Sequence, residues 1–502
     1  MIMEYEARFE SKDAFYASFS KYHLRTGKFG KKITESFPYG GDGGVPLAWR
    51  EEDKTVFLDT SDSHTLIIGA TGSKKSRLFV MPTVKLLGYA GESMIITDPK
   101  AEIYERTAAE LLKNGYKISV INLRNPLEGN SWNPLEIPYQ FYCTGYKDKA
   151  YECVNDIATN LMLSEISIKD PYWDYTASDL FLGLTLLLFR ICKENNWPDL
   201  VNVDSLLLLR RKIFSEYMDY GQFIKKPIGK LIEDDDIIEA SLIGSIGNAQ
   251  NTQKNIMCIF DSKMRTFIIQ PTLSQMLSKS NIQLDSIGEQ KAAIFLIMPD
   301  EKTSYHKLIS VFIKQSYEYL IYQAQNIPQK RMPVRINYIL DEFSSLPTIK
   351  DFPSMISAAR SRNIRFNLVI QSKHQLTQRY AGEAETIQSN CLNWVFLTSR
   401  ELMLLNDISA LCGTRTGSNK PLISISELQR FNKEKGEVLI LSGRRRPFKG
   451  CLPDIDMYDE TKFDVLDLPY NTIAQNNTRR MELEEKLDSL LASGKKNDFL
   501  DW

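Results

Sequence analysis

Residues 65–76 read TLIIGATGSKKS. The apolar run 65–69 has the length and composition of a buried parallel strand. A Gly/Ser-rich turn follows it and leads into a basic segment that begins a helix. A strand, a glycine-containing turn and a helix in this order are the setting of a phosphate-binding loop, where backbone N–H groups and the helix N-terminus attract an anion. The stretch therefore predicts an α/β nucleotide-binding domain.

The loop itself supplies the candidate nucleotide contacts. They are Gly69, Thr71, Gly72, Ser73, Lys74, Lys75 and Ser76. In such a loop Lys75 reaches the β- and γ-phosphates, and the Ser76 hydroxyl binds Mg²⁺. The pattern G-x-x-x-x-G-K-[ST] is broken at Lys74, which stands where the last glycine belongs and adds a Cβ where the backbone passes closest to the nucleotide. We therefore expect ATP and Mg²⁺ as cofactors, with weak hydrolysis. The competing interpretation is a plain Ser/Thr/Gly turn before a basic helix start.

A second acidic element lies far downstream. Residues 336–340 form an apolar strand that ends in Asp341-Glu342. A strand of this kind can bring Asp341 to the Mg²⁺ and Glu342 to the attacking water. Taken alone, the pattern also fits a strand that merely ends at the surface. Together with an upstream phosphate loop, it predicts the catalytic carboxylates of an ATPase.

Two further candidates follow these acids. Arg360 closes a helical segment together with Arg362, and Gln371 follows the strand predicted at 366–370. An arginine donated by a neighbouring subunit can neutralise transition-state charge, and a glutamine at the sheet edge can sense the γ-phosphate. The alternative for both arginines is a solvated helix end, where basic residues suit the helix dipole.

The remaining strand signals are short apolar runs separated by helical segments. They lie at 93–97, 118–122, 292–298, 366–370, 394–397 and 437–441, with a helix predicted at 101–114. This alternation predicts a doubly wound, mostly parallel sheet. Glycine is sparse between 150 and 255 and leucine recurs at helical spacing, which predicts an all-α domain inserted into the sheet domain.

The expected organisation has five parts. They are an N-terminal extension at 1–45 with the character of a flexible loop, the first part of the nucleotide-binding domain at 46–149, the all-α domain at 150–255, the second part at 256–470, and a charged tail at 471–502. In the tail, one apolar helix face is predicted from Met481, Leu483, Leu487, Leu490 and Leu491.

Composition narrows the choice of partners. The chain has 502 residues, 43% of them hydrophobic, and a net charge of -1, so no global basic signature for nucleic acid is present. DNA contact must then come from local patches at 210–212, at 225–226 with 230, or at 444–446, or from an assembled ring. The seven scattered cysteines favour neither a zinc site nor disulfides. The apolar run 180–192 contains Arg190 and is shorter than the roughly 20 residues of a membrane-spanning helix, so we expect a buried helix.

Six blocks, in order, resemble the TraG/TraD-type coupling proteins of type IV secretion and conjugation. They are 64–76, 93–108 (with Asp-Pro-Lys), 132–135 (Trp-Asn-Pro-Leu), 169–177, 340–372 (LDEFS, AARSR and Gln-Ser) and 389–391. The resemblance implies a RecA-like hexamer around a DNA channel, with the all-α domain contacting the DNA-processing complex. It assigns Lys75 and Ser76 to the phosphate loop, Asp341 and Glu342 to the catalytic acids, Arg360 to the arginine finger and Gln371 to the nucleotide sensor.

The resemblance also implies a function. The chain would be a coupling-protein ATPase that drives relaxase-bound single-stranded DNA to a type IV secretion channel. Family members usually carry an N-terminal membrane anchor, which we do not find in this sequence. We therefore expect a cytoplasmic protein that docks at the inner face of the membrane through a membrane-bound partner. Two alternatives stay open. One is a non-hydrolysing adaptor, motivated by Lys74. The other is a RecA-like DNA motor with another task, such as chromosome partition or phage defence.

Overall fold

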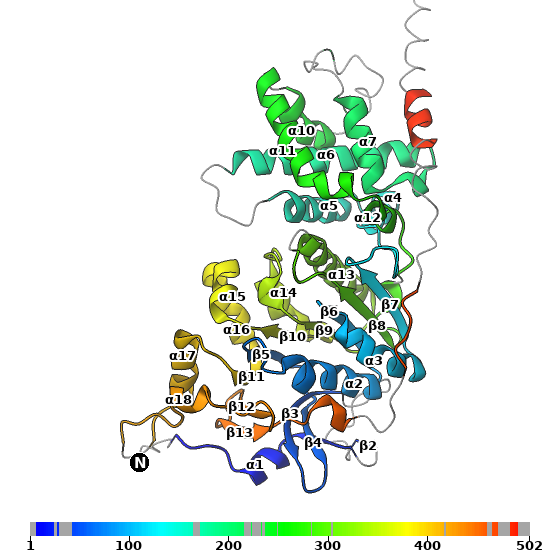
Figure 1. Ribbon diagram of the computed structural model, residues 1–502. Coiled ribbons are helices and arrows are strands. Elements are labelled where there is room, and N and C mark those ends of the chain that lie inside the picture. Colours follow the sequence, from blue (N-terminus) through cyan, green and yellow to red (C-terminus); the bar gives the residue numbers. More distant parts are fainter. Residues whose placement is uncertain are drawn as a thin grey trace, which may run out of the picture. The chain divides into compact units, whose positions relative to one another are not determined.

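The structure is a computed structural model that describes residues 7–24, 28–29, 43–163, 171–214, 222, 232, 236–247, 249–282, 284–302, 305–415, 418–458, 464–469 and 482–489. The chain divides into two compact units (Figure 1). The first, here called the sheet unit, comprises Met1–Val120, Gln283–Glu301 and Ser316–Asp467. The second, here called the helical unit, comprises Ile121–Ile282, Lys302–Gln315 and Leu468–Trp502.

The sheet unit is built on a nine-stranded sheet. In spatial order its strands are β13 (Phe448–Cys451), β12 (Glu437–Ser442), β11 (Cys391–Thr398), β5 (His64–Gly69), β10 (Ile364–Ile370), β9 (Ile336–Leu340), β6 (Ser93–Asp98), β8 (Ala292–Ile297) and β7 (Lys117–Asn122). Neighbours from β11 to β8 are parallel, whereas β12 and β13 are antiparallel. The central strands β5, β6, β8, β9 and β10 are buried along their whole length, as expected where both faces are covered.

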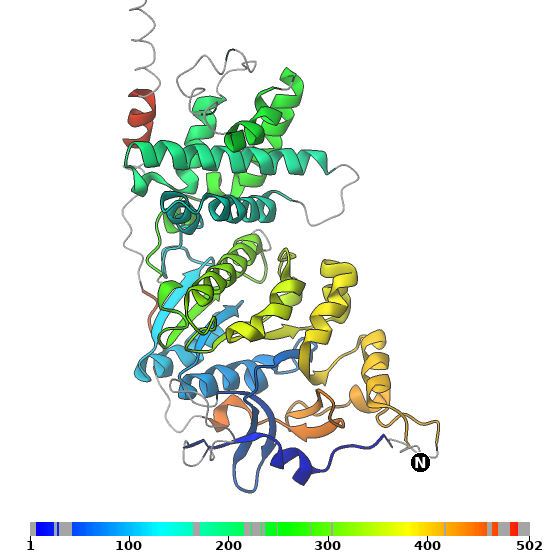
Figure 2. The ribbon, with the colours of Figure 1, turned by 180° about the vertical axis from the view of Figure 1, so that it is seen from behind.

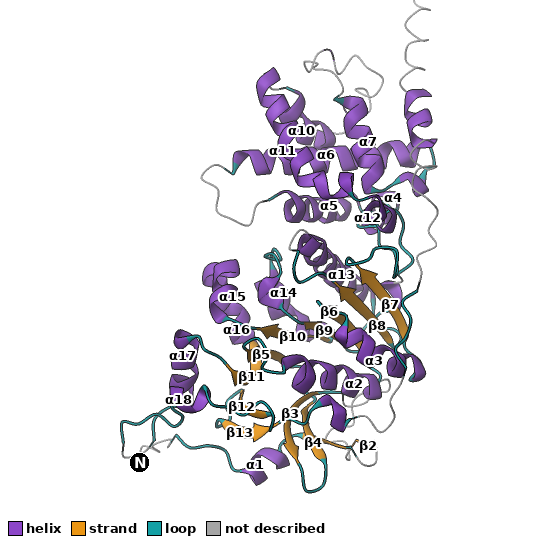
Figure 3. Ribbon diagram, viewed as in Figure 1, coloured by secondary structure: helices purple, strands orange, loops and turns teal. Residues whose placement is uncertain are grey.

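Helices connect these strands (Figure 3). They include α2 (Met81–Ala90), α3 (Glu102–Lys113), α13 (His306–Asn326), α14 (Phe352–Ala359), α15 (Lys373–Tyr380), α16 (Ala384–Asn390), α17 (Leu402–Cys412) and α18 (Ile425–Leu428). All eight strands predicted from sequence are present, and the predicted helix at 101–114 is α3. The α/β fold class is therefore confirmed. The edge strand β13 was not predicted.

A second, antiparallel sheet of the sheet unit was also not predicted. Its order is β2 (Lys28–Phe29), β1 (Ser20–His23), β4 (Thr55–Asp59) and β3 (Val45–Arg50), and α1 (Lys12–Ala17) precedes it. The expectation of a flexible loop at 1–45 is wrong for residues 7–24, because their aromatic side chains are buried. Phe15 stacks on Phe448 with ring centroids 3.8 Å apart, and Tyr16 stacks on Phe57 at 4.1 Å.

The helical unit centres on one long helix, α6 (Tyr172–Glu194), which runs across it (Figure 2). Around it lie α4 (Glu136–Cys143), α5 (Lys147–Met162), α7 (Val203–Ile213), α10 (Asp236–Ile246), α11 (Gln250–Ile269) and α12 (Pro271–Met276). Among the described residues, α6 alone is long and apolar enough to cross a membrane, but 78% of its most apolar window is buried inside the protein. The predicted buried helix at 180–192 is confirmed, and it is longer than the apolar run. The unit also extends beyond 150–255, since α4 and α12 belong to it.

A short helix at 482–489 packs on the helical unit. Leu483 and Leu487 are buried, and Lys212 of α7 forms ion pairs with Glu484 at 3.1 Å and Asp488 at 2.8 Å. The apolar face predicted for the tail is therefore confirmed at these two leucines. Met481, Leu490 and Leu491 lie outside the described residues.

Candidate functional site

The candidate site lies where the parallel strands of the nine-stranded sheet reach their carboxyl ends, here called the carboxyl edge. Strands β5, β10 and β9 are adjacent and parallel, so their carboxyl ends meet at the same edge. The loop 70–75 follows β5, Asp341 follows β9, and Gln371 follows β10. Ligands of open α/β sheets bind at this edge.

The loop after β5 has the curled backbone of a phosphate loop. Gly72 and Lys74 have φ angles of 74° and 64°, in the left-handed region that favours glycine. Ala70 N–H donates to Thr398 O of β11 at 2.9 Å, and Ser73 N–H donates to Ala70 O at 3.1 Å. Gly69 is constrained differently, because a Cβ there would lie 2.5 Å from Ser73 Oγ. Gly72 is thus favoured by its left-handed backbone, and Gly69 is required because a Cβ has no room there.

Lys75 points its ammonium into this loop. Its Nζ donates to Gly69 O at 2.7 Å, and its side chain is buried. Burial lowers the Lys75 pKa from its usual value, while the carboxylates of Glu342 and Asp341 act in the opposite direction. A buried cation inside a loop of curled backbone is placed to attract an anion.

Two side chains bring oxygen atoms together next to Lys75. Ser76 Oγ donates to Asp341 Oδ2 at 3.3 Å. Asp341 is 6% exposed, and burial, followed by the nearby Glu342, raises its pKa to about 6. A hydroxyl and a carboxylate in this arrangement are the hard oxygen ligands that Mg²⁺ prefers.

A chain of hydrogen bonds joins the loop to the second acid. Thr71 Oγ1 donates to Gln371 Oε1 at 2.8 Å, and Gln371 Nε2 donates to Glu342 Oε1 at 2.5 Å. Gln371 therefore bridges the phosphate loop and Glu342 across the end of β10. A change at the loop can be transmitted to the carboxylate through this amide.

The residues present fit a nucleotide and its metal ion. Ser73 Oγ is buried and has no hydrogen-bond partner among the described residues. This hydroxyl, the buried Lys75 ammonium and the Ser76 hydroxyl belong to one short loop, and Ser76 joins Asp341 to it. Such a set suits a phosphate oxygen and a divalent cation.

Asp98 is a site residue that the sequence reasoning missed. It ends β6, the strand next to β9, and accepts a hydrogen bond from Tyr104 N–H of α3 at 2.8 Å. Burial raises its pKa to about 7. The preceding Thr97 donates to Asp341 O at 2.8 Å and so fixes the backbone of the catalytic candidate. The Asp-Pro-Lys block at a strand end was the available signal.

Arg360 does not join this group. It begins a 3₁₀ turn, Arg360–Arg362, that precedes β10, and Ile364 of β10 pairs with Ile336 at the amino end of β9. The Arg360 side chain is exposed. The structure thus places it at the opposite edge of the sheet from the phosphate loop of its own chain.

The basic patches considered for DNA contact are partly engaged within the fold. Arg210 pairs with Asp261 at 2.6 Å, and Lys212 pairs with the helix at 482–489. Arg445 pairs with Glu10 and lies over the ring of Phe19, with its Cζ 5.2 Å from the centroid. Lys225, Lys226 and Lys230 lie outside the described residues.

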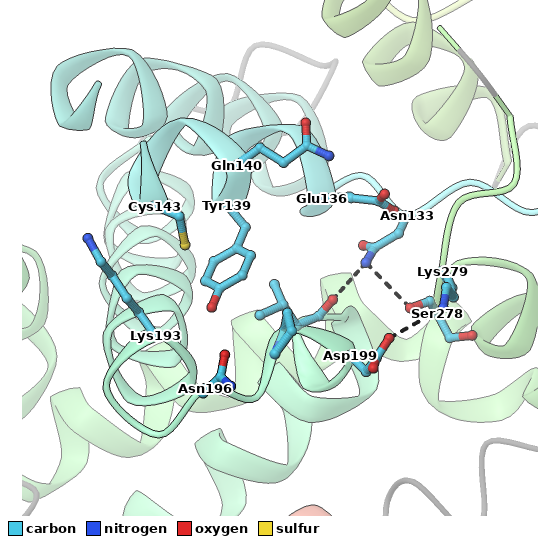
Figure 4. A pocket seen from close by; sticks show the side chains of 12 residues that line it. Asn133, Glu136, Tyr139, Gln140, Cys143, Lys193, Asn196, Asp199, Ser278 and Lys279 are labelled. Atoms are coloured by element: carbon cyan, nitrogen blue, oxygen red, sulfur yellow. Dashed lines mark hydrogen bonds and ion pairs between the residues drawn. The ribbon is translucent and has the colours of Figure 1, made fainter. Parts of the chain in front are cut away.

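A cavity of about 420 Å³ occurs elsewhere, in the helical unit (Figure 4). It is lined by α4, by the end of α6 and by Lys279. Its polar groups bond to one another: Asn133 Nδ2 donates to Val201 O at 2.6 Å, and Lys279 pairs with Asp199 at 3.4 Å. None of the phosphate-loop residues lines it, so it is distinct from the candidate site.

Comparison with known proteins gives a consistent result. Residues 17–436 match the family model described as "Type IV secretory system Conjugative DNA transfer". Conjugal transfer protein TraG of Escherichia coli is 24% identical over 365 residues, covering 68% of this chain and 54% of TraG. Protein VirD4 of Rhizobium radiobacter is 22% identical over 343 residues, covering 67% of this chain and 46% of VirD4. The chain thus spans about half the length of these two relatives.

Solved structures with the same fold include those of the bacterial conjugative coupling protein TrwB. Its unbound form matches with a TM-score of 0.60 at 13% identity, covering 93% of this chain and 96% of TrwB. TrwB has also been solved with the non-hydrolysable ATP analogue ADPNP, with a TM-score of 0.58 at 14% identity over 93% of this chain and 96% of TrwB. A further structure contains ADP and Mg²⁺, with a TM-score of 0.58 at 13% identity over 93% of this chain and 95% of TrwB. The shared architecture is the RecA-like P-loop fold.

Proposed function

The chain belongs to the type IV secretory system conjugative DNA transfer family, and from this we propose that it is a coupling-protein ATPase that drives DNA toward a secretion channel. The observation that carries the proposal is the meeting of Lys75, Ser76, Asp341, Glu342 and Gln371 at one sheet edge. Those five side chains supply each role that ATP hydrolysis requires within one subunit. Weak turnover is expected, since Lys74 occupies a glycine position.

Each residue has a distinct part in this proposal. The loop from Gly69 to Ser76 binds the phosphates, with Lys75 neutralising their charge. Ser76 and Asp341 hold Mg²⁺, which supplies charge neutralisation at the phosphates when bound. Glu342 orients the attacking water and takes its proton, while Gln371 aligns Glu342 through the 2.5 Å hydrogen bond.

The partners are proposed from the family. DNA, as a relaxase-bound single strand, is the cargo, and relaxosome proteins and secretion-channel components are the protein partners. We propose a hexamer at the cytoplasmic face of the membrane, joined to the channel by a membrane-bound docking protein. We propose that the sheet unit is the RecA-like motor and that the helical unit, which contains residues 150–255, is the all-α domain.

Glu342→Gln tests the enzymatic proposal. The change removes the water-orienting carboxylate and keeps the size of the side chain. Turnover of ATP, with and without single-stranded DNA, should fall at least about 100-fold, the usual loss when a general base is removed. Binding of a fluorescent ADP should stay within about twofold, because Glu342 is not a phosphate ligand. Hydrolysis at the parent rate would contradict the assignment of Glu342.

A second candidate function is a non-hydrolysing adaptor. Lys74 is the observation that favours it, because a phosphate loop without its last glycine can retain the fold and lose turnover. The two proposals differ in one assay. An adaptor binds nucleotide and a relaxase complex but shows no ATP hydrolysis above that of the Glu342→Gln variant, even with DNA present.

A further inference from the structure

Two loops of the C-terminal β-hairpin lie at the same sheet edge as the phosphate loop. Strand β12 is antiparallel to β11, so it starts at the carboxyl edge of the parallel strands, and β13 ends there. Residues 430–436 precede β12, and residues 452–457 follow β13. The two loops are joined, since Leu452 N–H donates to Gly436 O at 2.8 Å. Gly436 has a φ of 64°, and a Cβ on it would lie 2.1 Å from Leu452 O.

These loops carry acids that pair with cations on the phosphate-loop segment. Lys74 Nζ forms an ion pair with Glu434. Arg77, three residues further on, donates from Nε to Asp454 at 3.0 Å and from Nη2 to Asp456 at 2.5 Å. The hairpin therefore contacts the segment on both sides of Lys75, through side chains that point away from the loop interior.

The turn around Glu434 is held in place by its own hydrogen bonds. Asn432 Oδ1 accepts from the N–H of Glu434 at 2.9 Å and from the N–H of Lys435 at 3.2 Å. Asn432 N–H donates to Glu437 Oε2 at 2.9 Å, which ties the turn to the start of β12. The carboxylate of Glu434 is thus presented by an ordered turn, and the bond from Lys74 lowers its pKa from the usual value.

Neighbouring lysines consequently point in different directions. Lys75 donates to Gly69 O inside the loop, whereas Lys74 bonds to Glu434 outside it. Asp454 of the same hairpin also feels the Lys74 charge, but its carboxylate already accepts from Arg77. An ammonium released from Glu434 would therefore add its positive charge to the side of the loop that faces a bound phosphate. With Glu434 present, that charge is neutralised on the hairpin side.

We propose that Glu434 is a positioning residue that lowers nucleotide affinity: it holds the Lys74 ammonium outside the phosphate loop and neutralises a charge that would otherwise add to the attraction for phosphate. The inference rests on the proposed function, because it assumes that the loop binds a nucleotide. It adds a residue from a hairpin outside the phosphate loop and the catalytic strand ends. It also gives Lys74 an ion-pair partner within the same chain.

Glu434→Gln, with and without Lys74→Gly, tests the proposal. Freeing the Lys74 ammonium adds a cation beside the anion site, so fluorescent ADP should bind about two- to fivefold more tightly, the range expected for one exposed ion pair. The added attraction should weaken with salt, since exposed charges are screened. In the Lys74→Gly background the same change should have no effect. Glu385→Gln, an exposed acid on α16, is the matched control in both backgrounds.

A measurement without ligand accompanies the binding assay. Hydrogen exchange of segments 70–80 and 430–436 in the nucleotide-free protein should rise in Glu434→Gln and stay unchanged in Glu385→Gln. The inference is overturned if Glu434→Gln leaves binding or exchange unchanged, weakens binding, or has the same effect in the Lys74→Gly background. The proposed function fails by a different result: the parent binds no nucleotide, or Lys75→Ala binds ADP as tightly as the parent does. Either of these results would also remove the basis of the inference.

Discussion

Lys74 shows how a lysine can occupy a glycine position without changing the path of the loop. Its φ of 64° is the conformation that glycine would supply at no steric cost. For an L-residue, the left-handed region costs about 1 kcal/mol. The loop therefore keeps its curvature at the expense of local strain, and Lys75 still reaches its interior.

This strain leads to a prediction for Lys74→Gly. The change should alter the stability of the sheet unit by less than about 1 kcal/mol, because relief of the left-handed penalty is offset by the greater freedom of glycine in the unfolded chain. Loss of the Lys74–Glu434 pair also offsets that relief. It should also tighten ADP binding, since no Cβ remains where the backbone approaches the phosphates. Thermal unfolding and fluorescent-nucleotide titration measure the two effects. Lys75→Ala should weaken binding at least about tenfold by removing the buried ammonium, whose charged hydrogen bonds are individually strong.

The opposite pattern would reassign the two lysines. If Lys75→Ala were harmless and Lys74→Ala inactivating, Lys74 would be the phosphate-binding residue. The geometry argues against this, because the Lys74 ammonium is committed to Glu434 while Lys75 Nζ lies 2.7 Å from Gly69 O.

The sequence was sufficient to predict that the phosphate-loop lysine, the strand-end aspartate and the glutamine lie close together. Lys75, Asp341 and Gln371 each follow a short apolar run, and the carboxyl ends of parallel strands share an edge. Glu434 could not be found in this way, because it is 360 positions from its partner and reaches the site only through an antiparallel hairpin. Arg360 was correctly identified as a helix end, and the same argument applies to it: it precedes β10, so it lies at the amino ends of the parallel strands, opposite the phosphate loop.

Among the elements, the strands of the large sheet with apolar runs were predicted, but β4 (TVFLD) was missed although it is buried throughout. Strands β5 (HTLIIG) and β9 (INYIL) are buried throughout, and each contains three leucine or isoleucine residues. By contrast, β1 (SKYH) has only one buried residue, and its pairing with β4 is between segments more than 30 residues apart. Helix α1 is likewise fixed by a distant contact, the stacking of Phe15 on Phe448.

His64 connects three elements and makes their association sensitive to pH. It begins β5, donates from Nε2 to Ile356 O of α14 at 2.7 Å, and accepts at Nδ1 from Phe366 N–H of β10 at 2.9 Å. Both bonds together require the neutral ring. Burial lowers the His64 pKa to about 4. Between about pH 6.5 and pH 4 the unfolded chain therefore binds a proton that the folded chain excludes, and stability falls as pH falls through this window.

His64→Gln should flatten this dependence. The contribution of one such group approaches about 1.4 kcal/mol per pH unit inside the window and vanishes above it. Denaturation midpoints at pH 7.5 and pH 5 should thus differ less in His64→Gln than in the parent, although the variant is less stable at pH 7.5. His374→Gln, on the exposed side of α15, should keep the parental difference. Equal pH dependence in His64→Gln and the parent would show that His64 is not the responsible group.

For the whole molecule, the central question is how Arg360 could act on a nucleotide. The seven residues of β10 separate Arg360 from Gln371, and at about 3.3 Å per residue the two sheet edges lie roughly 20 Å apart. An arginine side chain is far too short to cover that distance. Arg360 can therefore serve a phosphate loop only if the loop belongs to another subunit, which agrees with the proposed hexamer.

A net charge of -1 has a related consequence for assembly and cargo. A near-neutral chain has no long-range attraction for DNA, and two of the three basic patches are partly paired within the fold. DNA contact is thus expected from surfaces that a ring brings together, so DNA-stimulated hydrolysis and assembly should appear at the same protein concentration.

Mixing of inactive subunits tests the role of Arg360 in trans. Arg360→Ala and Lys75→Ala should each lose ATP hydrolysis, the first by about 10³-fold, as for other arginine fingers. A mixed ring restores some interfaces in which an intact phosphate loop faces an intact Arg360, so activity should partly return on mixing. Mixing Lys75→Ala with Glu342→Gln is the matched control. Both changes affect the subunit that supplies the phosphate loop, so every phosphate loop in a mixed ring has one defect and no activity should return. Rings of mixed composition, seen by native mass measurement, that remain inactive with Arg360→Ala would assign Arg360 to a structural role at the amino edge of the sheet.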